Sequence, residues 1–133
     1  MQPSQIRTSM ATTIKAVVLT KHGPGDRFVV LAAAREPEQV IGRAVMIKLI
    51  GGGQDEANTC ARFVTYQVVV FYEPSDDIDN RIADDSRLLD DGLWTLQTAH
   101  ADITEVAVSD FAVSEDAGRI ATRRDVRVVY QHE

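Results

Sequence analysis

Apolar residues in the N-terminal segment recur at the spacing of one helical face. They are Ile6, Met10, Ile14, Val17 and Val18. A period near 3.6 residues places these side chains on one stripe, and Ser4 is suited to cap the start of the helix. Glycine and proline within residues 21–26 mark a chain reversal. The segment therefore predicts an amphipathic helix followed by a loop.

Three stretches in the first half of the chain have the pattern of β-strands. Residues 27–34 predict a short strand, and the alternation within residues 44–50 predicts a mostly buried one. Residues 62–73, RFVTYQVVVFYE, are dominated by β-branched and aromatic side chains and predict the clearest strand. The glycine run at 51–53 and the polar residues after it predict a long flexible turn between the last two strands.

Residues 75–97 predict a loop and then a second amphipathic helix. Its apolar face consists of Ile82, Leu89, Leu93 and Leu96, with Ser86 in the small position between them. Aspartates gather at and before the first turns, where the helix dipole and the unpaired backbone N–H groups favour negative charge.

The C-terminal part of the chain predicts a β-hairpin. Its strands, 102–114 and 119–131, flank a loop at 115–118 that ends in glycine. In the second strand one face carries Ile120, Val126, Val128 and Tyr130, and the opposite face carries Arg119, Arg123, Asp125 and Arg127. That pattern is typical of a half-buried antiparallel strand with one charged side.

The order of these elements predicts an α+β fold. At 133 residues the chain has the length of one domain, so we expect residues 1–133 to form a single unit. We expect a mostly antiparallel sheet of about four strands, with two main helices packed on one face.

Composition narrows the range of partners. The formal net charge of −6 disfavours general binding of nucleic acid or acidic membranes, because the long-range electrostatic term is repulsive. The single cysteine, Cys60, cannot form an internal disulfide. No apolar run has the length of a membrane span, and the N-terminal residues lack a secretory-signal pattern.

Familiar catalytic and metal-binding motifs are not found in this sequence. The glycine run is followed by Gln54-Asp55-Glu56 rather than by the Gly-Lys-Ser/Thr of a phosphate-binding loop. Asp77 and Asp79 fit the first two positions of a calcium loop, but Arg81 occupies the third. Because the histidines are scattered and Cys60 has no histidine nearby in sequence, we expect no enzymatic activity, no cofactor and no metal site.

Charge is distributed unevenly between the second helix and the last strand. Acidic residues dominate residues 73–91, and arginines dominate residues 119–127. Two interpretations stand side by side: the helix and the strand neutralise each other within one molecule, or a basic edge of one subunit meets an acidic edge of the next.

The order of elements resembles the tail terminator (tail-completion, minor tail) proteins of long-tailed bacteriophages, most of all those of actinobacterial siphophages. The resemblance rests on the strand RFVTYQVVVFYE, the helix DDSRLLDDGLWTLQ and the hairpin ITEVAVSDFAVSEDAGRIATRRDVRVVY. It covers residues 62–131 well and the N-terminal helix loosely, in pattern and length rather than in a diagnostic motif.

The resemblance implies a structural virion protein of the tail and neck, assembled in the host cytoplasm. Such a subunit would form a ring, expected to be hexameric, that caps the tail tube, stops its polymerisation and joins it to the head connector. Its partners would be copies of itself, the tail tube protein and the head–tail connector protein, with no membrane. DNA would pass through the lumen without specific binding, which suits an acidic protein.

The same resemblance makes the charged residues candidates for contacts between subunits. They are Arg119, Arg123, Arg124 and Arg127 on the last strand, with Asp84, Asp85, Asp90 and Asp91 of the helix opposite them. The alternatives are another neck or head-completion protein that also forms rings and, in a different class, a small α+β enzyme or ligand-binding domain with a pocket beneath the Gly51 loop.

Overall fold

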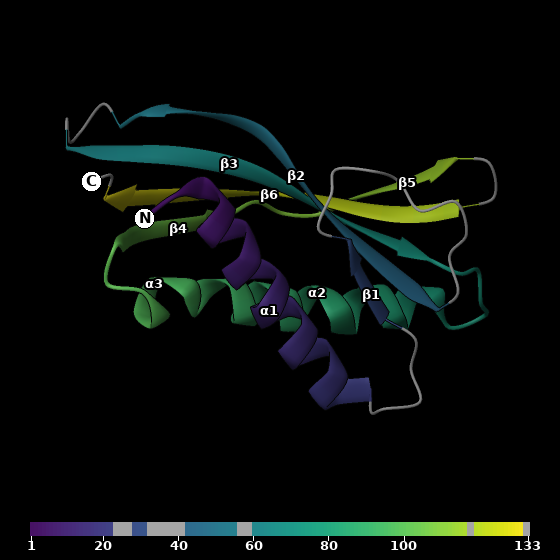
Figure 1. Cartoon of the computed structure of the whole chain (residues 1–133). Coiled ribbons are helices and arrows are strands. Elements are labelled where there is room, and N and C mark those ends of the chain that lie inside the picture. Colours follow the sequence, from purple (N-terminus) through teal and green to yellow (C-terminus); the bar gives the residue numbers. More distant parts are fainter. Residues whose placement is uncertain (23–27, 32–41, 56–59, 117–118, 132–133) are drawn as a thin grey trace.

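A computed structural model describes residues 1–22, 28–31, 42–55, 60–116 and 119–131, and in these ranges the chain has the expected α+β architecture. Figure 1 shows a twisted sheet with the helices gathered on one side of it. The elements are α1 (Pro3–His22), β1 (Phe28–Leu31), β2 (Arg43–Gln54), β3 (Ala61–Tyr72), α2 (Ile78–Trp94), α3 (Leu96–Ala99), β4 (Ile103–Val108), β5 (Ala112–Asp116) and β6 (Arg119–Gln131).

The sheet is antiparallel except at one edge. Its strand order is β1-β2-β3-β6-β4, with β5 also paired to β6, and β1 runs parallel to β2. β4 pairs with the C-terminal half of β6 and β5 with the N-terminal half, so the two occupy the same edge in succession. The described residues thus form six strands rather than about four, partly because one expected strand is split in two.

The main core lies between the helices and one face of the sheet. Ile6, Met10 and Ile14 of α1 are fully buried there, which confirms these three positions of the expected N-terminal stripe. Val17 is partly buried, and the side chain of Val18 lies outside what the structure describes. The expected apolar face of the second helix is buried in the same cluster, as are Val126, Val128 and Tyr130 of β6. A smaller cluster on the other face of the sheet consists of Ala44, Met46, Val69, Phe71 and Ala121.

A glycine sets the approach of the two long helices. A Cβ atom at Gly92 of α2 would lie 2.9 Å from Cγ2 of Val17 of α1, closer than a side-chain carbon tolerates. Gly92 costs some helix propensity, and the close packing of α1 on α2 explains its position within an otherwise regular helix.

The glycine run does not form the expected flexible turn. Gly51, Gly52 and Gly53 continue β2 and pair with β3, after a bulge at which Ile50 is the extra residue. A Cβ atom at Gly52 would lie 2.9 Å from the carbonyl oxygen of Phe63, so a close approach of two backbones accounts for glycine in this strand.

Two expected boundaries also differ. α1 continues through Lys21 and His22, which were expected in the loop; the rest of that loop lies outside the described residues, as do residues 27 and 32–34 of the first expected strand. The segment 102–114 is not one strand but breaks between β4 and β5, where the backbone N–H of Ser109 donates to the carbonyl oxygen of Asp125 at 2.9 Å and the Asp125 N–H donates to the Ser109 hydroxyl at 2.8 Å. The Ser109 hydroxyl oxygen here takes the place of a backbone carbonyl oxygen as the acceptor between the two strands.

The hairpin loop is shorter than expected. β5 includes Glu115 and Asp116, which pair with Ile120 and Arg119 of β6. Residues 117 and 118 lie outside the described ranges.

Candidate functional site

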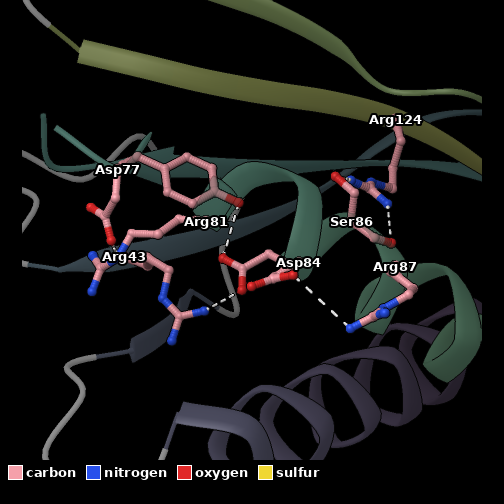
Figure 2. Close-up of polar contacts among 9 residues, drawn as sticks. Arg43, Asp77, Arg81, Asp84, Ser86, Arg87 and Arg124 are labelled. Carbon is pink, nitrogen blue, oxygen red and sulfur yellow. Dashed lines mark hydrogen bonds and ion pairs between the residues drawn. The ribbon is translucent and has the colours of Figure 1, made fainter. Parts of the chain in front are cut away.

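A buried ion pair joins the second helix to the sheet. A guanidinium nitrogen of Arg43 on β2 lies 2.7 Å from a carboxylate oxygen of Asp85 on α2, and both side chains are only 2% exposed. The hydroxyl of Tyr72 on β3 donates to the other Asp85 oxygen at 3.1 Å. Figure 2 shows the Arg43 guanidinium directed toward α2 from the sheet. Asp85 thus links α2 to two neighbouring strands.

A second buried arginine makes a parallel contact from β6. Arg124, with a side chain 1% exposed, donates to Asp90 at 2.6 Å, and it donates to the hydroxyl and carbonyl oxygens of Ser86 at 2.9 and 3.3 Å. Its guanidinium carbon also lies 5.6 Å from the centre of the Phe111 ring. The small Ser86 therefore does more than leave space on the helix, because it binds the guanidinium (Figure 2).

Strand alternation explains why these arginines point inward. Arg124 is in phase with Val126 and Val128, and Arg43 is in phase with Val45 and Ile47, so each shares the helix-covered face of the sheet. The same alternation was readable in the sequence as a signal for Arg124. Arg43 and Tyr72 were not singled out, because a buried pair depends on a partner far away in sequence.

The chemistry of this cluster is that of a structural tie. Burial, and next the negative charge of Asp85, raise the pKa of the Tyr72 hydroxyl far above its ordinary value of 10.0, so the phenol remains a donor. The Asp85 carboxylate accepts from Arg43 and Tyr72 and is almost fully buried. A carboxylate so enclosed stabilises the packing of α2 and is poorly placed to meet a substrate.

The raised pKa of Tyr72 predicts a loss of stability in strong alkali. Above pH 10 the phenol ionises in the unfolded chain but stays protonated in the folded one, so rising pH favours unfolding. One such group lowers the free energy of unfolding by about 1.4 kcal/mol per pH unit. Urea titrations of the wild type and Tyr72→Phe between pH 8 and about pH 11 should give a shallower alkaline slope of the free energy of unfolding for the variant. Some slope should remain in the variant, because burial also raises the pKa of Tyr66. Equal slopes would contradict this assignment.

The other candidate arginines lie apart from α2. Arg123 and Arg127 are on the sheet face away from the helices: Arg123 donates to the Ser114 hydroxyl at 3.0 Å, and Arg127 stacks at 4.4 Å on the Phe63 ring and reaches Asp55 at 3.5 Å. Arg119 is partly exposed at the start of β6.

The candidate aspartates divide in the same way. Asp85 and Asp90 face the sheet and accept from Arg43 and Arg124. Asp84 and Asp91, seven residues apart, lie on the outer side of α2, where Asp84 is within 4.0 Å of Arg87. The structure therefore joins Arg124 to Asp90 within one chain and leaves the outward-facing charges on opposite layers of the molecule.

The surface of the described residues includes the following two hollows. One, of ≈ 380 Å³, lies between the first half of α2 and β5 and is lined by Ile78, Ile82, Ala83, Phe111, Val113 and Ile120, with Asp79 and Glu115 also in its lining. The other, of ≈ 720 Å³, is a polar depression between the start of α1 and the residues His100 and Asp102.

The lining of the larger hollow includes Ser4, Ser9, His100 and Asp102. Within the described ranges, no cluster of three or more histidine, cysteine, aspartate or glutamate side chains is arranged to hold a metal ion. In that same part of the chain, no helix combines the length and the apolar character needed to cross a bilayer. A search of protein-family profiles and of curated protein sequences finds no match to this chain.

Proposed function

We propose that this protein is a ring-forming structural subunit of the neck of a long-tailed phage, which caps the tail tube and joins it to the head connector. The observation that supports the proposal is the separation of its outward charges. Arg123 and Arg127 lie on one face of the sheet, and Asp84 and Asp91 lie on the outer side of the helix layer. Because the sheet and α2 stand between the two sets, these arginines cannot pair with these aspartates within one molecule. On its own face Arg127 reaches Asp55, and Asp84 lies near Arg87.

Complementary surfaces on opposite sides of one chain favour a head-to-tail contact between copies. Such a heterologous contact closes into a ring when its rotation allows. The contact surfaces in this proposal exclude Arg124 and Asp85, which are buried, and Asp90, which already binds Arg124. The net charge of −6 is compatible with a lumen through which DNA slides without being held.

The ligand-binding alternative loses its original basis. It placed a pocket beneath a glycine loop, but Gly51 and its neighbours are part of β2. The same separation of charges is compatible with a neck or head-completion ring of another kind, which would bind a partner other than the tail tube.

Light scattering with mass determination, followed by negative-stain imaging, tests the proposal. We expect discrete rings, either in solution or on the ends of tail tubes, and tubes polymerised with the protein should stop at a defined length. Replacing Arg123 and Arg127 by glutamate should weaken assembly, whereas Lys15→Glu, which changes an exposed charge on α1, should not. A protein that stays monomeric and neither binds nor shortens tail tubes would sink the proposal.

A further inference from the structure

The groove between α2 and β5 has the character of a docking site. Ile78, Ile82 and Ile120 contribute apolar surface, Phe111 and Val113 are exposed beside them, and Asp79 and Glu115 add negative charge. A contiguous exposed apolar surface of this kind marks an interaction site. Its acidic members select an apolar partner that carries a positive charge nearby.

A segment with that chemistry is present elsewhere on the same chain. At the β2 bulge, Leu49 and Ile50 are 48% and 45% exposed, and the exposed Lys48 precedes them. A bulge redirects the side chains of its strand, here leaving two large aliphatic groups in solvent. The next residue, Gly51, has no atom within 4 Å of where its Cβ would be, so the surroundings are open.

The bulge cannot reach the groove of its own molecule. β3 and β6 lie between β2 and β5 in the sheet, and Figure 1 shows the C-terminal part of β2 and β5 at opposite ends of it. Along the strands, Leu49 is level with Tyr66 and Val126, six residues from Ile120. That spacing corresponds to roughly 20 Å.

We propose that the β2 bulge of one copy, Lys48, Leu49 and Ile50, occupies the α2–β5 groove of the next copy. The two aliphatic side chains enter the ≈ 380 Å³ hollow. Lys48 is in phase with Met46, on the opposite face of β2 from Leu49, and its long side chain extends toward Asp79 and Glu115. This inference rests on the proposed ring, for which it names the contact.

The bulge and the groove each lie next to one of the charged surfaces described above. Arg127 is level with Thr65 and Gly51, at the bulge end of the sheet, whereas Asp84 follows the groove residue Ala83. A bulge seated in the neighbouring groove therefore brings the Arg127 end of one copy toward the Asp84 end of the next. Hydrophobic and electrostatic contacts then favour the same head-to-tail direction.

Cysteine cross-linking tests the contact in the full chain. In a Cys60→Ser background, one preparation carries Ile50→Cys and another carries Val113→Cys. Mild oxidation of their mixture should give a disulfide-linked dimer of the two variants, and the double variant should give a ladder of linked copies up to the closed ring. Ile50→Cys combined with Thr98→Cys, an exposed position on α3, is the matched control and should give little ladder.

A charge exchange supplies a second readout. Lys48→Glu should weaken assembly about tenfold or more, because it places like charges against each other. Glu115→Lys in the same chain should restore assembly.

The outcomes separate the inference from the proposed function. Rings without the bulge–groove disulfide, and without rescue by the charge exchange, would overturn the inference and leave the proposed function standing. A disulfide ladder formed in open filaments that cap no tube would support the bulge–groove contact and contradict the proposed closed ring. Absence of both assembly and cross-link would remove both.

Discussion

Replacing Asp85 by alanine is expected to lower the free energy of unfolding by about 3–5 kcal/mol, the range for breaking a buried ion pair from one side. The change leaves the Arg43 guanidinium buried without its carboxylate, and the Tyr72 hydroxyl loses its acceptor. Urea denaturation followed by circular dichroism measures the loss.

The neighbouring aspartate is the matched control. Asp84→Ala removes the same group from the outer side of α2, where the ion pair with Arg87 is exposed, and should change stability by less than about 1 kcal/mol. Replacing both members of the buried pair, by Arg43→Met with Asp85→Leu, should recover much of the loss, because no uncompensated charge remains. Equal effects of Asp85→Ala and Asp84→Ala would show that Asp85 does not tie α2 to the sheet.

Arg124→Glu is expected to prevent folding or to cost more than about 4 kcal/mol. The new carboxylate would be buried where the arginine side chain is 1% exposed, and it would face Asp90 instead of neutralising it. Arg124→Met keeps much of the packing and leaves Asp90, which is 44% exposed, to be hydrated, so its cost should be about 1–3 kcal/mol. Thermal and urea unfolding of the purified variants give both values.

The adjacent arginine should show the reverse behaviour. Arg123→Glu alters a partly exposed side chain on the other face, so stability should change by less than about 1 kcal/mol while assembly weakens. If Arg124→Glu folded normally and only assembly suffered, the internal role of Arg124 would be wrong.

The helical faces were the most predictable part of the chain. Ile6, Met10 and Ile14 recur at a period that fits one helical face and no strand, and the apolar positions of α2 do the same. The phase of β6 was also readable from its alternation. Both signals are local, since each side chain's direction follows from the backbone geometry of its own element.

The glycine run and the Ser109 break were less predictable. Glycine has a weak preference for strands, and only the close approach of Phe63 across the ladder shows why Gly52 belongs in one. The break depends on a hydrogen bond from Asp125, which lies sixteen residues along the chain from Ser109. The conformational preferences of neighbouring residues carry no information about a partner so far along the chain.

By itself, the sequence determined the class of the fold, the apolar faces of both long helices and the inward and outward sides of β6, because periodicity acts within a single element. Tertiary structure decided which charged side chains form ion pairs inside the molecule and which remain on its surface. In the sequence, Arg124 and Asp85 carry the same charges as their neighbours Arg123 and Asp84. A shift of one residue nevertheless places Arg124 and Asp85 between the helix layer and the sheet. There the burial of charge demands a partner, and the packing of α2 on the sheet supplies it.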